Sequence, residues 1–430
     1  MQIEVFIRLV LSMRSIISLA IVLISYFVYG QKQLAFSDKS YEDEVRTVML
    51  YSSVGGSRNN LRSAVAPIQN QNLVLEFDDL QAERSNYYVK FINCNVDWIK
   101  SSLMDLDFLT DYNEFPITEY DLSSNVSIPY VHYYFKLPAV KLPGNYLLVV
   151  YRESDENDIL LTRRFMIYSN EATIFQDNLL QGQGTLYASN QQLNFKVNYS
   201  QLDVVNPMET VHAVIRQNQR WDNVRLNVKP SFIREDKREL EYRFFDQDDQ
   251  FKAGNEFRFV DFRSLNYPGQ NTGRIDRSKR PFDLWVQTDK SREDQAYAIY
   301  ADLDGNFVIE NQDYRDAAFS GDYVFVTFTL AVPPVNGSVY LLGAMNNWSR
   351  SPESKMSFKK DQNVYQTTLL LKQGLYNYQY WVESDKKNGF QMEGSHFQTE
   401  NLYEIFIYYR PFRPNTDLLI GYYPIQVNPH

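Results

Sequence analysis

The chain has 430 residues, and at about 150 residues per domain this length predicts two or three domains rather than one core. Aromatic residues make up 15% of the chain, with 32 tyrosines and 28 phenylalanines, which is typical of β-sheets because flat rings pack well across strands. The net charge of -10 is spread without a sustained basic block, which argues against nucleic acid as a partner, and the single cysteine excludes an internal disulfide.

The N-terminus has the pattern of an export signal. A basic start at Arg14 precedes an apolar run from Ile16 to Tyr29, and Gly30 supplies a small side chain before a cut. We expect a signal peptide over residues 1–30 and cleavage near Gly30–Gln31, whether translation starts at Met1 or at Met13. An uncleaved membrane anchor is the alternative.

Residues 31–169 are predicted to form an N-terminal β-sandwich. Apolar and polar side chains alternate along its segments, as strands with one buried face require, and turn signals recur about every dozen residues. The predicted strands are VRTVMLYS, LVLEFDDL, YYVKFINCNVDW, YVHYYFKLP, GNYLLVVYRE and LLTRRFMIY.

Residues 170–320 are predicted to form a second β-sandwich. Its expected strands are QLNFKVNYS, ETVHAVIRQNQRW, ELEYRFF, GNEFRFVDFR, FDLWVQT and AYAIYADLDGNFVIEN. Gly254 is expected to enter its strand through a tight turn that only glycine favours. Asp304-Gly305 predicts a two-residue hairpin, which we prefer to a calcium loop because the glycine lies too early and the distal glutamate is missing.

Residues 321–412 are predicted to form a third sandwich, followed by a tail over 413–430 that holds a short extra strand. Asn336-Gly337 joins two of its strands, Asn388-Gly389 marks a hairpin, and Leu402 to Tyr409 is its last strand. No helix longer than a turn or two is required. The expected fold class is all-β, with three tandem immunoglobulin-like or early-set sandwiches.

No catalytic, metal or cofactor site emerges from the motifs. The four histidines, His132, His212, His396 and His430, lack metal-ligand spacing, and Cys94 on an apolar strand is expected to be a small buried hydrophobe. GQGTL at residues 182–186 is a turn rather than a phosphate loop. A glycosidase-like carboxylate pair stays open, because such pairs come from distant strands.

Two polar clusters are expected to be structural. Asn93, Asn95 and Asp97 alternate at the end of a strand, where such side chains bond neighbouring backbone. A basic series is interrupted by acidic residues and is interpreted as a solvated face. It comprises Arg216, Arg220, Arg225, Lys229, Arg234, Lys237 and Arg238.

Several blocks, in order, resemble the plug protein family of the type 9 secretion system of Bacteroidetes. They are YYVKFINCNVDW, SIPYVHYYFKLP, GNYLLVVYRESDENDILLTRRFMIY, NPMETVHAVIRQNQRWDN, GNEFRFVDFR, SGDYVFVTFTL, VYLLGAMNNW and LLLKQGLYNYQYWV. The resemblance implies a non-enzymatic periplasmic protein that docks beneath the outer-membrane translocon barrel and closes its pore until cargo arrives. It implies no cofactor, and contact with the membrane only through the protein partner.

The positions that carry this resemblance are expected to be structural. They are Asn93, Cys94, Asn95, Asp97, Trp98, Gln217, Asn218, Arg220, Trp221, Gly254, Asn255, Glu256, Phe257, Arg258, Gly343, Asn347 and Trp348.

Two other functions stay open. The third sandwich is similar to glycogen-binding modules, in which a turn like that of Gly343, Asn347 and Trp348 follows a strand, so a glycan-binding protein of the cell envelope is the alternative. We expect Trp348 to fill the core instead. Alternating aromatic strands also fit a chain that itself spans the outer membrane, although the last residues lack a terminal aromatic.

Overall fold

The computed structural model describes residues 32–53, 61–176, 186–244, 250–314, 316–384 and 389–429. The expected signal peptide and most of the GQGTL turn lie outside these residues. Strands make up 45% and helices 6% of the structure, which confirms the all-β prediction. No helix within the described ranges is long and apolar enough to cross a membrane.

Unit 1, residues 32–169, is a sandwich of two sheets around one core. The first sheet has the order β1-β10-β9-β5-β6, with β3 parallel to β10, and the second has the order β2-β4-β8-β7. Along β5 the side chains of Tyr87, Val89 and Phe91 are buried while those between them are less so, as the alternation predicted.

The elements of unit 1 are β1 (Lys39–Ser40), β2 (Val45–Ser52), β3 (Val65–Pro67), β4 (Leu73–Asp79), β5 (Tyr87–Cys94), α2 (Asp105–Phe108), β6 (Phe115–Pro116), β7 (Glu119–Leu122), β8 (Val131–Lys136), β9 (Gly144–Arg152) and β10 (Asp155–Tyr168).

Unit 2 is built from two parts of the chain, residues 170–253 and 397–429. Its sheets have the orders β11-β13-β17-β16 and β15-β14-β28-β29, with the short pair β12-β18 beside them.

The elements of unit 2 are β11 (Thr173–Gln176), β12 (Asn190–Gln191), β13 (Phe195–Asn198), α3 (Pro207–Thr210), β14 (Val211–Gln217), β15 (Val224–Val228), β16 (Phe232–Arg234), η2 (Glu235–Lys237), β17 (Glu239–Tyr242), β18 (Phe251–Lys252), β28 (Asn401–Tyr409) and β29 (Leu418–Val427).

Unit 3, residues 254–396, lies in sequence between the two parts of unit 2. One sheet has the order β19-β27-β22, with β24 also paired to β27, and the other has the order β20-β21-β23-β26-β25. Both sheets enclose one hydrophobic core.

The elements of unit 3 are β19 (Arg258–Asp261), β20 (Thr272–Asp276), β21 (Asp283–Val286), β22 (Phe307–Ile309), α4 (Ala317–Ser320), β23 (Tyr323–Leu330), β24 (Ser338–Leu342), η4 (Ala344–Asn346), β25 (Ser357–Lys359), β26 (Val364–Lys372), β27 (Gly374–Glu383) and η5 (Gly389–Met392).

The sheets group the strands differently from the expected boundaries at 320 and 412. The strands β19 to β22, expected in the second sandwich, pair within unit 3, and β28, expected to close the third sandwich, pairs with β14 from Val211 to Gln217. The tail strand β29 pairs with β28 over its length. The prediction assumed tandem order, and local patterning carries no signal for pairing between strands so far apart in sequence.

The turn signals predicted the backbone conformation correctly but not which strands pair. Gly254 has a φ of 71°, and Asp304 and Gly305 have φ values of 51° and 81°, as expected for these turns. However, residues 297–302 form no strand, and β22 pairs with β27 instead. The hairpin expected at Asn388-Gly389 falls partly outside the described residues, and the strands on either side of it, β27 and β28, lie in different sheets.

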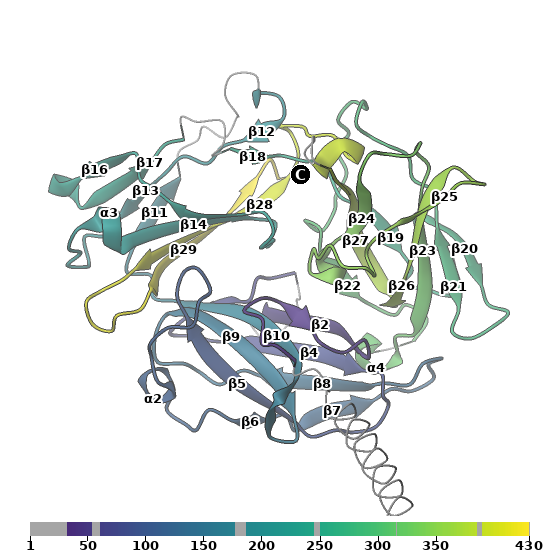
Figure 1. Cartoon of the computed structure of the whole chain (residues 1–430), viewed down its shortest axis with the longest axis horizontal. Helices are drawn as coiled ribbons and strands as arrows, with labels where there is room; N and C mark the ends of the chain where they lie inside the picture. Colours follow the sequence, from purple (N-terminus) through teal and green to yellow (C-terminus); the bar gives the residue numbers. More distant parts are fainter. Residues whose placement is uncertain are drawn as a thin grey trace, which may run out of the picture.

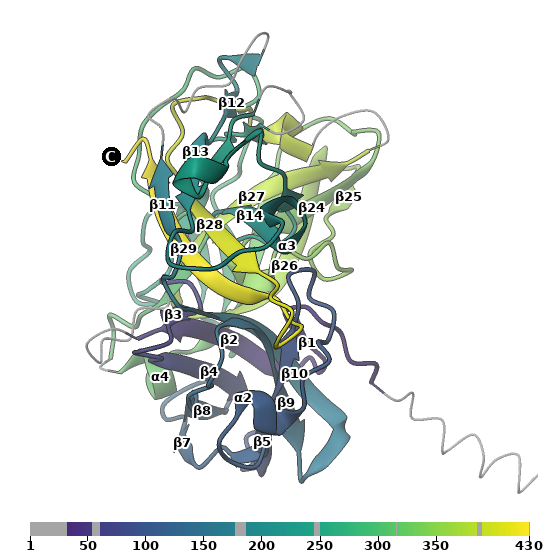
Figure 2. The same ribbon diagram turned by 90° about the vertical axis from the view of Figure 1, so that its left-hand side faces the viewer.

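The three units form a triangle, so that each contacts the other two. Figure 1 shows unit 1 at the bottom, unit 2 at the upper left and unit 3 at the upper right. In Figure 2, turned by 90°, unit 1 occupies one end and units 2 and 3 the other. The functional question is therefore what the junctions between the units do.

Candidate functional site at the junctions between the units

The junction of units 1 and 2 begins at the end of β5, where the polar residues of the NCNVD motif lie. Thr416 of unit 2 donates its hydroxyl toward the side-chain oxygens of Asn93 and Asn95, both at 3.2 Å. The backbone N–H of Val96 donates to Asp417 at 2.9 Å. The sequence predicted local backbone partners for these side chains, whereas Asn93 and Asn95 also hold the loop between β28 and β29.

Two tryptophans close the same junction. The rings of Trp98 and Trp221 meet edge to face with 5.0 Å between centroids, and the guanidinium of Arg164 lies 4.4 Å from the centroid of Trp221. Arg164 is anchored by Asp38 at 2.9 Å. Because Trp98 is only 6% exposed, this contact is a packed extension of the cores.

Units 2 and 3 are joined by two chain segments that bond to each other. The outgoing segment holds Gly254 and Asn255, whose backbone N–H and side-chain amide donate to Ser395 at 3.0 Å and to the carbonyl of Glu393 at 2.9 Å on the return segment. The side chain of Glu256 accepts from the backbone N–H of Glu400 at 3.1 Å. The two crossings are therefore fastened together rather than hinged.

A buried carboxylate organises the unit 3 side of this crossing. Glu393, 2% exposed, contacts Arg258 at 3.0 Å and Arg292 at 2.6 Å. Burial alone would raise the pKa of Glu393, but the charges of Arg258 and Arg292 hold it below its usual range. Arg258 also pairs with Asp289 at 2.8 Å.

Trp348 forms a second contact between units 2 and 3. Its ring is 7% exposed, packs 5.6 Å from the ring of Phe257, and is covered by the guanidinium of Arg220 from unit 2 at 4.0 Å. A Cβ at Gly305 would lie 2.5 Å from Trp348, so the Asp304-Gly305 turn also packs against this ring. Trp348 therefore offers no open face on which a sugar could stack.

The junction of units 1 and 3 is a buried network of charged and polar groups. Lys372 at the end of β26 lies 2.7 Å from Asp78 of β4, and Tyr323 donates to the same carboxylate at 2.7 Å. His132 bonds the other oxygen of Asp78 at 2.7 Å. Asp78 and Lys372 are 0% and 1% exposed, so this network is isolated from solvent.

The charge states in this network are set by mutual pairing. Burial would lower the pKa of His132, but its bonds with Asp78 and Glu76 raise it to about 9, so the ring is protonated at neutral pH. Burial would raise the pKa of Asp78, but Lys372 and His132 hold it below its usual range. Asp78 and His132 of unit 1 are therefore ionised beside Lys372 of unit 3.

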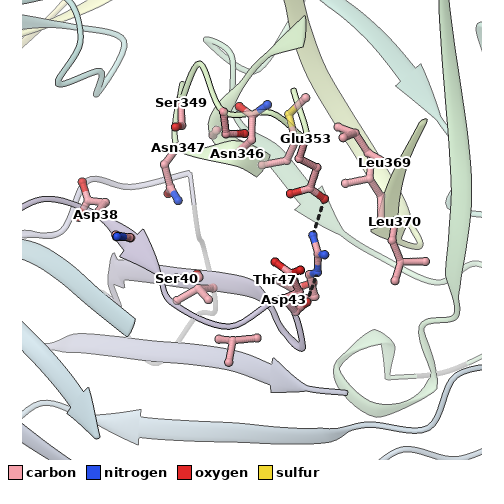
Figure 3. A pocket seen from close by; sticks show the side chains of 18 of the residues that line it. Asp38, Ser40, Asp43, Thr47, Asn346, Asn347, Ser349, Glu353, Leu369 and Leu370 are labelled. Carbon is pink, nitrogen blue, oxygen red and sulfur yellow. Dashed lines mark hydrogen bonds and ion pairs between the residues drawn. The ribbon is translucent and has the colours of Figure 1, made fainter. Parts of the chain in front are cut away.

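Cavities lie along the junctions between the units. One of about 600 Å³ separates unit 1 from unit 3 and is lined by residues that include Ser40, Thr47 and Asn347 (Figure 3). Another of about 700 Å³ lies between units 2 and 3, beside Arg225 and Trp381. Within the described parts of the chain, no group of three or more His, Cys, Asp or Glu side chains could hold a metal ion.

The structure gathers most of the family-signature positions at junctions. Asn93, Asn95 and Trp98 meet unit 2, while Arg220 meets Trp348. The segment from Gly254 to Arg258 forms the crossing. Other signature positions act inside a unit: Asn218 donates to Asn401 at 2.7 Å, and Gln217 donates to Tyr403 at 3.0 Å.

The remaining signature positions lie near these contacts. Asp97 accepts from the backbone N–H of Ile99, and Gly343 and Asn347 form the turn before Trp348, with a φ of 52° at Asn347. Cys94 is buried, and burial raises the pKa of its thiol to about 12.

Two arginines of the predicted solvated face are buried, which corrects that interpretation. Arg216 is 4% exposed and pairs with Glu404 at 2.7 Å, and Arg220 is 2% exposed. Lys229, Arg234, Lys237 and Arg238 are exposed as expected, and Arg225 is half-buried. Arg216 precedes the QNQRW motif and Arg220 lies within it, so the nearby Trp221 was the signal that could have separated them from the rest.

Sequence reasoning missed the network around Asp78 and Lys372. The only local signal is a charged residue ending an apolar strand, as in LEFDD and LLLKQG.

Comparisons with known proteins find one match to unit 1 and one match to nearly the whole chain. A family model described as the type 9 secretion system plug protein 1st domain matches residues 45–169. A hypothetical protein from Parabacteroides merdae ATCC 43184, whose crystal structure is known, is 28% identical with a TM-score of 0.85 over 92% of this chain and 100% of that chain. No curated protein matches. The arrangement of all three units thus recurs in a second protein.

Proposed function

We propose that this chain, whose residues 45–169 match the family model of the type 9 secretion system plug protein 1st domain, is a periplasmic plug of the translocon. It docks on the periplasmic mouth of the outer-membrane barrel and seals the pore until cargo passes. The match of residues 45–169 to the plug family carries this proposal.

The packing at the junctions supports the proposed role as a plug. A body that blocks a pore by steric exclusion has to be wide and to resist deformation, and it needs contacts that can be released. Trp98 against Trp221, Arg220 against Trp348, and Lys372 against Asp78 hold the three units as one body. Steric exclusion requires no chemistry, so we propose a non-enzymatic role without a cofactor.

A permeability measurement tests the proposal. Cells that lack this protein should take up a large antibiotic such as vancomycin, which an intact outer membrane excludes, because the barrel stays open. Sensitivity should return toward the parental level when the barrel is deleted as well. Unchanged sensitivity, or a rise that persists without the barrel, would contradict the plug mechanism.

Three further measurements test the partner and the location. The protein should co-purify with the barrel from detergent-solubilised outer membranes, and a salt or urea wash should release it from membranes. N-terminal sequencing of the native protein should begin near Gln31. Retention of the apolar run from Ile16 to Tyr29 would indicate an anchored protein instead.

The glycan-binding alternative gains no support from the candidate ring. Trp348 is covered by Phe257 and Arg220, and the similarity of the third unit to glycogen-binding modules stays a prediction.

A further inference from the structure

We propose that the cavity between units 1 and 3 binds a small organic or inorganic oxyanion, a carboxylate or a phosphate, and that Arg163 is the residue that anchors it. The inference is independent of the plug role, because it concerns a ligand site inside the body of the molecule.

The cavity has the size and position of a ligand site. Its volume of about 600 Å³ lies within the range of about 300–1,000 Å³ that is typical of small-molecule sites. Unit 1 contributes the segment from Ser37 to Val48 and Arg163 of β10, and unit 3 contributes the turn after η4 and the end of β26. A ligand here would contact both units at once.

Arg163 is a buried cation that no carboxylate of the described residues contacts directly, although the charge of Asp38 attracts it at longer range. Its side chain is 6% exposed and lines the cavity, and its Nη1 donates to the carbonyl of the neighbouring residue Thr162 at 2.8 Å. Among the described residues no Asp or Glu forms an ion pair with it. The nearby carboxylate of Asp38 is engaged by the backbone N–H of Arg164 at 2.7 Å and by its guanidinium at 2.9 Å.

Most other charges at this cavity are already paired. Glu42 contacts Lys32 at 2.5 Å and Arg152 at 2.8 Å, Glu353 contacts Arg46 at 2.7 Å, and Lys372 contacts Asp78 at 2.7 Å. Figure 3 shows Glu353 at one side of the cavity, with a dashed line to its partner. Lys39 and Asp43 are both exposed. Arg163 is therefore the buried cation of this cavity that has no carboxylate in direct contact, since Asp38 bonds to Arg164 instead.

The chemistry of Arg163 selects the ligand. A guanidinium presents several N–H donors in a fixed plane that matches the two oxygens of a carboxylate or phosphate. Burial lowers the pKa of Arg163 to about 10, so it keeps its charge at neutral pH. On the opposite wall Asn347 and Ser349 offer neutral hydrogen-bonding groups, and Figure 3 shows the Asn347 side chain pointing toward unit 1.

A structural role accounts poorly for this residue. A buried cation without a carboxylate in direct contact destabilises a fold, and an apolar side chain of similar length would be tolerated at least as well. Arg163→Met should therefore leave the thermal midpoint of the free protein unchanged or higher. This expectation separates a residue kept for a ligand from one kept for packing.

Titration calorimetry of the purified protein in low-salt buffer, with inorganic phosphate and with citrate as separate probes, tests the site. We expect saturable binding of at least one probe with a stoichiometry of one, and the probe that binds identifies phosphate or carboxylate chemistry. Arg163→Met should weaken binding at least about tenfold, the effect of losing one charge-assisted hydrogen-bonding group. Arg163→Lys should bind more weakly than the parent but better than Arg163→Met.

The matched control is Lys39→Gln, which removes an exposed cation at the same cavity and should change the Kd by no more than about twofold. Absence of saturation with both probes, or equal binding by Arg163→Met and the parent, would overturn the proposal. An equal loss in Lys39→Gln would overturn it too, since that result indicates unspecific attraction. If Arg163→Met does not fold, the comparison of Arg163→Lys with the parent decides.

Discussion

Unit 3 contacts its two neighbours by different physical means. Toward unit 2 it presents an aromatic ring, Trp348, which a guanidinium covers at 4.0 Å. Toward unit 1 it presents a buried ammonium, Lys372, which a carboxylate meets at 2.7 Å. Both side chains are more than nine-tenths buried.

This difference predicts how each contact responds to mutation. Packing of an aromatic ring contributes through the apolar area removed from water, and its loss leaves a cavity. A buried ion pair contributes little net free energy while intact, but removing one partner leaves the other charge without compensation. The contact with unit 1 should therefore respond to single charge changes and to pH, while the contact with unit 2 should respond to volume.

The largest effect should come from Lys372→Met. It leaves the Asp78 carboxylate buried without its ammonium, and the free energy of unfolding should fall by about 3–5 kcal/mol in urea denaturation. Lys359→Met, on the exposed end of the neighbouring strand β25, should change it by less than about 0.5 kcal/mol. Equal stability of the two variants would show that the Asp78 network is unimportant.

A loss of the same order is expected for Trp348→Ala. Emptying this buried aromatic site should cost about 3–5 kcal/mol, while Arg220→Gln, which removes the covering cation and its ion pair with Asp222 at 2.7 Å, should cost about 1–2 kcal/mol. Thermal and urea denaturation measure both. A Trp348→Ala variant that unfolds like the parent but loses retention on an amylose column would favour glycan binding.

The pH response of His132 should be smaller and should distinguish the two contacts. Its folded-state pKa of about 9 lies above the ordinary 6.5, so its contribution is complete below about pH 6.5 and is lost as pH rises through 9. Over this window the parent should lose about 2–3 kcal/mol relative to His132→Gln.

The free energy of unfolding of the parent is compared with that of His132→Gln at each pH, because Lys372 also titrates at the alkaline end. Burial lowers the pKa of Lys372, so its deprotonation changes the stability with the opposite sign. Parallel stability curves for the parent and His132→Gln would exclude a protonated His132.

The smallest effect should come from the exposed pair of Arg46 and Glu353, which also joins units 1 and 3. Its side chains are 23% and 47% exposed, so solvent screens their attraction. A double-mutant cycle with Arg46→Gln and Glu353→Gln should give a coupling below about 1 kcal/mol. A coupling above about 2 kcal/mol would mean that charge, buried or not, dominates this junction.

The sequence by itself determined the local structure of this protein. Alternation in YYVKFIN placed Tyr87, Val89 and Phe91 on one buried face, and the backbone at Gly254 and at Asp304-Gly305 adopts the positive φ values that these residues favour. Both signals depend on the period of a strand and on steric freedom at single residues, which lie in neighbouring positions of the chain.

Only the tertiary structure determined which strands pair and which side chains meet across the units. The pairing of β28 with β14, the covering of Trp348 by Arg220, and the meeting of Asp78 with Lys372 each join segments from distant parts of the sequence. A lysine at the end of a strand has the same local pattern whether it faces water or a buried carboxylate. Its environment is set by the packing of a second unit against it, and so is the anion-binding role that we infer for Arg163.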